Sequence, residues 1–307
     1  MRAPTIPLPL ARTLLRPLYR TIFRPRIPWR VQRAVLNGVA RCQPLPTGTL
    51  RRPLVLGERA AERVVADHDG GSGAVLYLHG GGYTVGSIGT HRSLAAHLAK
   101  RTRRPVYLLD YRLAPEHPCP AAVVDAVEAF LAMVVDEGHS PGDIALAGDS
   151  AGGGIALAAA QWLIHEHGMT PAALALISPW SDPAFVPVRR RDVVVNRAWG
   201  FACAGAYLGD GDALDWRYAP AQGDLCGLPP TYVLAAEEEI LRDQIVELAV
   251  ALRRSGTTVR YVESPRLWHA AQAQAGLVRQ AADSVRDIAG FLTIRFLQRS
   301  PKCRTLT

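Results

Sequence analysis

From residue 74 onward, short apolar runs alternate with longer segments that carry apolar residues at helical spacing. The runs predict strands over residues 74–78, 105–109, 143–147, 172–177, 231–235 and 258–263. The longer segments predict helices over residues 93–101, 121–137, 151–167, 241–255 and 276–297. Strands that are apolar on both faces and separated by helices form a parallel, doubly wound sheet covered on both sides. We therefore predict an α/β fold with its functional residues at the carboxyl ends of the strands.

Two segments interrupt this alternation. In residues 1–50, apolar side chains repeat at helical spacing, arginines repeat on another side, and Pro17 is expected to kink the helix. Residues 179–222 are too many for a simple connection between two neighbouring strands. We predict that both segments are additions to a core formed by residues 51–178 and 223–307.

The net charge of +8 is concentrated at the start of the chain. Residues 1–57 hold eleven arginines and no acidic residue, whereas the rest carries 24 basic against 27 acidic side chains. A nucleic-acid-binding protein presents its basic residues on a groove or face, together with a motif such as a basic region with heptads or paired Cys and His ligands. The sequence contains no such motif, so we expect no nucleic-acid partner.

The five cysteines are widely spaced and include no C-x-x-C pair, which disfavours both a disulfide framework and a zinc site. No run reaches the ~18 apolar residues of a membrane span, and prolines break the apolar stretch near the start. We expect a cytoplasmic protein with no bound metal. The arginine-rich start also fits a mitochondrial transit peptide, and this alternative stays open.

The first motif that points to chemistry is Gly-Asp-Ser-Ala-Gly-Gly over residues 148–153. It lies directly after a predicted strand and directly before a predicted helix. A G-x-S-x-G turn in that position is typical of a nucleophile elbow, in which the glycines permit a strained turn and leave the hydroxyl of Ser150 exposed. The alternative is a glycine-rich turn whose serine merely caps the helix.

The second motif is His-Gly-Gly-Gly over residues 79–82, again directly after a predicted strand. Consecutive glycines leave backbone N–H groups unshielded, as an oxyanion hole requires. The alternatives are a flexible loop or a phosphate-binding loop, but the spacing matches neither G-x-G-x-x-G nor a Walker A sequence.

Residues 79–82, 111–116 and 148–153, in this order, resemble the signature series of the bacterial hormone-sensitive lipase family of α/β hydrolases. The resemblance runs from about residue 57 to residue 297. It implies an α/β-hydrolase fold with a mostly parallel, eight-stranded sheet, and a helical cap built from residues 1–50 and 179–222. It also implies serine-dependent hydrolysis of carboxylic esters, usually with short or medium acyl chains.

In this fold the acid and the base follow the nucleophile, in the order Ser, acid, His. His269 is the histidine that lies after Ser150 and outside the helix following it. Acid candidates after the strand at 231–235 are Glu237, Glu238, Glu239 and Asp243. Alignment with the family pattern favours Glu239 and leaves Asp243 as the main alternative.

These assignments predict a mechanism in which Ser150 attacks the ester carbonyl, His269 accepts its proton, and Glu239 orients the imidazole. The N–H groups of Gly81, Gly82 and Ala151 are expected to form the oxyanion hole. The mechanism needs no cofactor or metal. We expect the segment at 111–116 to be structural, with its Arg and Glu paired rather than catalytic.

Substrate choice is expected to depend on aromatic residues near the cap. We expect Tyr83, Trp199 and Trp268 to contact the substrate, a small-molecule ester, although aromatic residues at such spacing are also common in plain core. Lactones, aryl amides and formamides react through the same triad and stay open as alternative substrates. A purely binding role, as in the related plant gibberellin receptors, is disfavoured because those receptors have lost the catalytic histidine. A homodimer is also possible.

Residues 1–33 have two interpretations. As part of the cap, Leu10, Leu14, Leu18 and Ile22 cover the active site and the arginines face solvent. As a membrane-surface helix, the same apolar face enters the headgroup region and the arginines contact anionic lipid. The family resemblance favours the cap.

Overall fold

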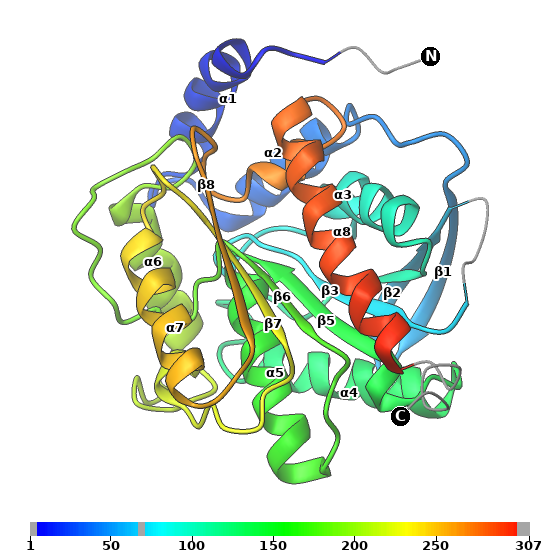
Figure 1. Cartoon of the computed structure of the whole chain (residues 1–307). Helices are drawn as coiled ribbons and strands as arrows, with labels where there is room; N and C mark the ends of the chain where they lie inside the picture. The colour runs from blue at the N-terminus through cyan, green and yellow to red at the C-terminus, as the bar shows by residue number, and fades with distance from the viewer. Residues whose placement is uncertain (1–4, 67–70, 300–307) are drawn as a thin grey trace.

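The computed structural model describes residues 5–66 and 71–299, and its centre is one eight-stranded sheet (Figure 1). The strands follow the spatial order β1-β2-β4-β3-β5-β6-β7-β8. β2 is antiparallel to both of its neighbours, and all other neighbouring pairs are parallel. The strands are β1 (Leu50–Leu56), β2 (Arg59–Val65), β3 (Ala74–Leu78), β4 (Val106–Leu109), β5 (Ile144–Asp149), β6 (Leu174–Ile177), β7 (Thr231–Ala236) and β8 (Val259–Ser264).

Helices cover both faces of the sheet, because successive strand residues point to opposite sides. Val75 and Tyr77 of β3 join the core beneath α3 (Ile88–Thr102) and α8 (Arg279–Arg299). Leu76 and Leu78 join the core on the other face. That second face is covered by α4 (Ala121–Val135), α5 (Ala151–His167) and α7 (Arg242–Arg254). The predicted doubly wound α/β architecture is confirmed.

The hairpin of β1 and β2 at the sheet edge is absent from the predicted strands. β1 carries Arg51, Arg52 and Pro53 and is exposed along most of its length, so it shows neither an apolar run nor alternation. Pro53 is tolerated there because an edge strand has one row of N–H groups without a partner strand. All six predicted strands are present, with ends shifted by one or two residues.

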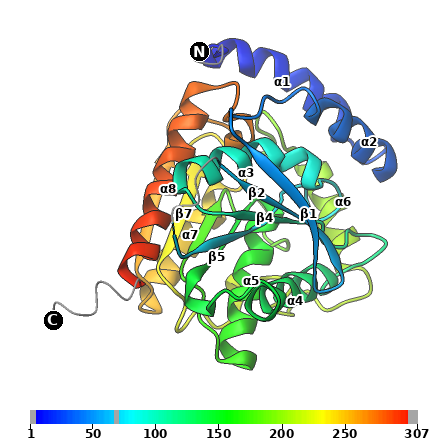
Figure 2. The same ribbon diagram turned by 90° about the vertical axis from the view of Figure 1, so that its right-hand side faces the viewer.

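Three longer helices lie outside the sheet layers: α1 (Leu8–Ile22), α2 (Trp29–Ala40) and α6 (Arg197–Leu208). We refer to α1, α2 and residues 179–222 as the cap. α1 and α2 form the outer edge of the molecule in Figure 2, at the end opposite α4. Three short 3-10 turns complete the described elements: η1 (Pro141–Asp143), η2 (Pro220–Gln222) and η3 (Ala271–Gln274).

The two parts of the cap are joined by side-chain contacts. The rings of Phe23 and Trp199 stack with their centroids 4.2 Å apart, and the Trp199 indole N–H donates to Gln32 Oε1 at 2.9 Å. The Asn196 amide donates to the carbonyl of Phe23 at 2.7 Å. The start of the chain and the insertion therefore pack as one layer, although 173 residues separate Phe23 from Asn196.

Helix α1 runs from Leu8 to Ile22 with Pro17 inside it, and its inward face differs from the predicted one. Ile22 is buried as expected, but Leu10 and Leu14 are 50% and 57% exposed. Ala11 and Leu15 pack inward in their place, because the inward face of α1 is rotated by about one residue from the predicted one. In the part of the chain that the structure describes, no helix is long and apolar enough to cross a membrane.

Candidate active site

Ser150 lies at the turn between β5 and α5 with φ 53° and ψ −122°, a backbone conformation that L-residues rarely adopt. Neighbouring glycines permit this turn. A Cβ at Gly148 would lie 2.4 Å from the backbone of Gly152, and a Cβ at Gly152 would lie 2.0 Å from the carbonyl of Leu78. The strand, turn and helix therefore have the geometry of a nucleophile elbow.

A hydrogen-bonded chain connects three of the predicted site residues. Ser150 Oγ lies 2.8 Å from His269 Nε2, and His269 Nδ1 lies 2.7 Å from Glu239 Oε2. An ionised carboxylate only accepts hydrogen bonds, so the imidazole proton is on Nδ1 and Nε2 is free to accept from the Ser150 hydroxyl. Asp243, the alternative acid, is exposed in the first turn of α7 beside Arg242.

The acid is fixed on both of its oxygens. Glu239 Oε1 accepts from the backbone N–H of Ala236 at 2.7 Å, which directs Oε2 toward the imidazole. Glu239 is 1% exposed and His269 is 3% exposed, so water does not compete for this pair. Glu239, just after the end of β7, thus contacts the imidazole although a glutamate has one methylene more than an aspartate.

His269 has a raised pKa. Burial lowers it, but the hydrogen bond to Glu239 and the negative charges of Glu239, Asp192 and Asp149 together outweigh burial and bring the pKa above the ordinary value of 6.5. Asp192 comes from the cap, where its carboxylate accepts backbone N–H groups of Val194, Val195 and Ile240. The protonated form of His269 is therefore stabilised by its surroundings.

Gly81 and Gly82 follow β3 with φ values of +135° and +58°, and both line a cavity together with Ser150. Ala151 is the first residue of α5. Within residues 5–66 and 71–299, the backbone N–H groups of these three residues donate no hydrogen bond. They are therefore available to an oxygen atom beside Ser150.

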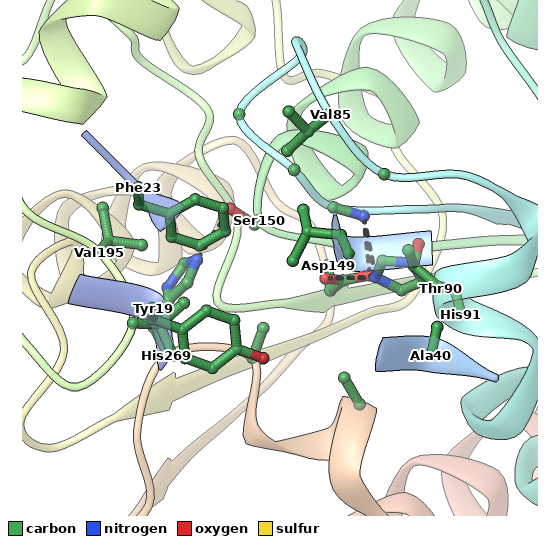
Figure 3. A pocket seen from close by; sticks show the side chains of 18 of the residues that line it. Tyr19, Phe23, Ala40, Val85, Thr90, His91, Asp149, Ser150, Val195 and His269 are labelled. Carbon is green, nitrogen blue, oxygen red and sulfur yellow. Dashed lines mark hydrogen bonds and ion pairs between the residues drawn. The ribbon is translucent and has the colours of Figure 1, made fainter. Parts of the chain in front are cut away.

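The loop after β3 is tied to the residue before the nucleophile. Asp149 Oδ1 accepts from the N–H of Gly80 at 3.1 Å and from the hydroxyl of Tyr77 at 2.8 Å, and Asp149 Oδ2 lies 3.2 Å from His91 Nε2 (Figure 3). Burial raises the Asp149 pKa, but the charge and hydrogen bond of His91 bring it below the ordinary range. Sequence reasoning assigned no role to these residues, although Asp149 lies within the elbow motif itself.

Two cavities meet at the reacting side chains, and Ser150, Val195, Trp199 and His269 line both. The larger has a volume of about 110 Å³ and the smaller about 30 Å³. The cap covers the larger cavity with Leu18, Tyr19, Phe23, Leu36, Val39 and Val194. Burial raises the pKa of Tyr19 to about 12, so its hydroxyl stays protonated beside the site.

The chain is similar to known proteins in both sequence and structure. A family model for the alpha/beta hydrolase fold matches residues 75–273. A putative acetyl-hydrolase of Mycobacterium tuberculosis is 32% identical over 267 residues, which cover 86% of this chain and 85% of that protein. The crystal structure of an esterase from the bacterial hormone-sensitive lipase family matches with a TM-score of 0.88 at 30% identity, over 93% of this chain and 98% of that one. This chain belongs to that family of α/β hydrolases.

A further relative, an acetyl-hydrolase of Streptomyces hygroscopicus, is 40% identical over 200 residues, or 64% of this chain and 67% of that protein. The hydrolase described here is an enzyme that acts on carboxylic ester bonds, as its family and esterase relatives show. The predicted family, fold class and enzyme class are confirmed.

Two of the three aromatic residues expected at the substrate do not reach either cavity of the hydrolase. Tyr83 is buried, stacks on Tyr207 with ring centroids 3.8 Å apart, and donates its hydroxyl to the carbonyl of Trp180. Trp268 packs beneath α1 and donates to Gln274 Oε1. Trp199 alone lines the cavities as predicted. The other two fill gaps beneath the cap, which local sequence does not reveal.

The segment at 111–116 forms structural ion pairs in the hydrolase, as expected. Arg112 pairs with Asp125, and Glu116 pairs with Arg33 of α2 in a bidentate ion pair. Arg33 also donates to the carbonyls of Thr84 and Ala114, so it anchors α2 beside the glycine loop. Among the described residues, no group of three His, Cys, Asp or Glu side chains is placed to hold a metal ion.

Proposed function

We propose that this hydrolase is a carboxylesterase for short-chain esters that uses Ser150 as nucleophile, His269 as general base and Glu239 as orienting acid. The observation that carries the proposal is the hydrogen-bonded chain from Ser150 Oγ through His269 to Glu239, at 2.8 and 2.7 Å. These distances lie within the 2.6–3.2 Å range that proton transfer requires. The same three residues were selected from the sequence.

In the proposed mechanism, Ser150 Oγ attacks the ester carbonyl as its proton moves to His269 Nε2. The carbonyl oxygen becomes an oxyanion that accepts from the N–H groups of Gly81, Gly82 and Ala151. His269 then gives the proton to the alcohol oxygen, the C–O bond breaks and the alcohol leaves. A water molecule repeats the sequence on the acyl-enzyme, which releases the acid and restores Ser150.

The preference for short chains rests on the size of the two cavities. Their volumes of about 110 and 30 Å³ are well below the roughly 300–1,000 Å³ of pockets that enclose drug-sized ligands. Trp199 and Val195 line both cavities and restrict the size of each. A small acyl group and a small alcohol group therefore fit better than a long chain on either side.

The test is hydrolysis of p-nitrophenyl esters from acetate to decanoate, combined with labelling by a fluorophosphonate. We expect kcat/KM to fall steadily beyond the short esters and the label to attach to Ser150. Ser150→Ala should lower kcat by about 10⁵-fold or more, because it removes the nucleophile. Ser93→Ala is the matched control, since that buried hydroxyl contacts the carbonyl of Pro44 outside both cavities.

A folded Ser150→Ala enzyme with wild-type turnover would contradict the proposed nucleophile. The same assay with a lactone and an aryl amide tests the alternative substrates. Faster hydrolysis of either one than of acetate and butyrate esters would overturn the preference for short linear esters and leave the triad in place.

A further inference from the structure

We propose that the outer face of α1 and α2 docks the enzyme onto an anionic phospholipid surface. We define this outer cap face by its exposed apolar residues and by the arginines beside them. It is distinct from the inner side of the same helices, which lines the catalytic cavity. The two interpretations of residues 1–33 assigned the same four side chains to both roles, whereas the structure places Leu18 at the cavity beside Ser150 and leaves Leu10 and Leu14 exposed, so the two roles are compatible.

The apolar part of the outer cap face consists of two stripes. On α1, Leu10, Leu14 and Pro17 recur at intervals of four and three residues, so they lie along one side of the helix, and all three are exposed. On α2, Val31 and Val35 are 43% and 39% exposed. An open groove of about 540 Å³ lies between the stripes and is lined by Pro17, Leu18, Thr21, Ile22, Ile27, Val31, Gln32 and Val35.

The basic part lies along the next side of α1. Arg16 and Arg20 line a groove with Arg189 and Arg191 of the insertion, and Arg24 and Arg190 extend it. In the described residues, none of these six arginines forms an ion pair. The two acids at this groove are already engaged, since Glu238 pairs with Arg12 and Asp192 accepts backbone N–H groups.

This combination identifies the partner by charge and polarity. A helix that shows one side of apolar residues beside a row of arginines suits the boundary between headgroups and acyl chains. Phosphate groups of anionic lipids supply negative charges for these six arginines, which form no ion pair among the described residues. A second copy of the chain fits less well, because a symmetric contact through this face would bring the arginine rows of both copies together.

The test is co-sedimentation of the Ser150→Ala protein with vesicles, which keeps the lipid intact and makes binding independent of the proposed esterase activity. One vesicle type contains two parts phosphatidylcholine and one part phosphatidylglycerol, and the other contains phosphatidylcholine alone. We expect binding to the anionic vesicles only. We also expect added salt to weaken this binding, because salt screens exposed charges.

Paired variants locate the surface. Arg16→Gln/Arg20→Gln should weaken vesicle binding roughly 30-fold, whereas Arg253→Gln/Arg254→Gln removes the same charge from the exposed end of α7 and should leave most of the binding.

Leu10→Gln/Leu14→Gln should weaken vesicle binding about tenfold. Its control, Val135→Gln/Leu297→Gln, changes two exposed apolar residues near the ends of α4 and α8. Hydrolysis of a soluble acetate ester in the Ser150 background reports folding of every variant.

Absence of binding to anionic vesicles at low salt would overturn the proposal. Equal losses in the test pairs and the control pairs would also overturn it, because binding would then follow net charge rather than this face. A concentration-dependent dimer that the Leu10 and Leu14 changes dissolve, without vesicle binding, would instead assign the face to a second copy.

Discussion

The floor and the roof of the catalytic cavity are built in different ways. The floor is formed by the ends of β3 and β5, where Asp149, Ser150 and the glycine loop are buried and backbone packs directly on backbone. The roof is formed by cap helices that are rich in arginine and partly exposed, and contacts such as those of Arg33 with Thr84 and of Arg12 with Glu238 join it to the floor. We therefore expect the floor to fix the geometry of Ser150 and its neighbours, and the roof to determine which substrates reach them.

The largest effects should come from the floor. Glu239→Gln removes the charge that holds the His269 proton on Nδ1, and we expect kcat to fall by about 10⁴-fold with little change in KM. Asp243→Asn is the matched control, because its carboxylate is exposed beside Arg242. Steady-state kinetics with a p-nitrophenyl acetate substrate measures both. A greater loss in Asp243→Asn would assign the acid to that residue.

A second change in the floor tests the link between the elbow and the glycine loop. Asp149→Asn replaces an oxygen that only accepts by an amide that must direct N–H donors at Gly80, Tyr77 or His91. We expect kcat to fall about 10²-fold, the size of effect seen when an oxyanion donor is lost. Inhibition by a boronic acid that mimics the tetrahedral intermediate should weaken in parallel. Unchanged boronate affinity would mean that Asp149 does not position the loop.

In the roof, Trp199→Ala should change selectivity more than chemistry. Removing the indole joins the two cavities, so the ratio of kcat/KM for octanoate over acetate should rise about tenfold, and stability should fall by about 3 kcal/mol. Trp216→Ala removes the same ring elsewhere in the insertion, where it lines neither cavity. Chain-length profiles and thermal unfolding of both variants make the comparison. An unchanged chain-length preference in Trp199→Ala would show that the indole does not limit the size of the acyl group.

The smallest effect is expected from Asp192, a cap carboxylate whose negative charge raises the pKa of His269. Because the His269 pKa is raised, kcat/KM of the wild type should increase with pH through a midpoint above 6.5. Asp192→Asn removes a negative charge that favours the imidazolium, so this midpoint should move to lower pH while the rate at high pH stays nearly constant. Asp210→Asn, an exposed change in the insertion, should leave the midpoint in place. A midpoint that moves upward in Asp192→Asn would contradict the sign of this interaction.

The division between floor and roof also explains which features the sequence predicted. Ser150, Glu239 and His269 lie on segments that follow predicted strands, so the order of strands along the chain places them at one edge of the sheet. The choice of Glu239 among the neighbouring acids came from the family resemblance. The buried strands β3 to β7 were predicted because burial on both faces leaves an apolar run, whereas the edge strand β8 is mostly half-buried. The motifs are visible in short stretches of sequence, and the fold is visible in the periodic spacing of apolar residues.

The roof depends on contacts between distant segments. Tyr83 and Trp199 are both aromatic residues near glycines, yet only Trp199 borders the cavities, because Tyr207 and Trp180 enclose the other ring. Leu10 and Leu14 have the spacing of an inward face, but the helix is held in a different rotation by Ala11, Leu15 and the ion pair of Arg12 with Glu238. No pattern within residues 1–50 specifies that rotation.

The Arg33 anchor has a consequence for exchanging caps between relatives. Its guanidinium donates to Glu116 and to the carbonyls of Thr84 and Ala114, next to the loop that carries Gly81 and Gly82. A chimaera that replaces residues 1–50 therefore removes a support of this glycine loop together with the helices that line the cavity at Ser150. An exchange designed to alter selectivity alone must transfer an arginine in register with Arg33, or it will lose turnover for a reason unrelated to substrate fit.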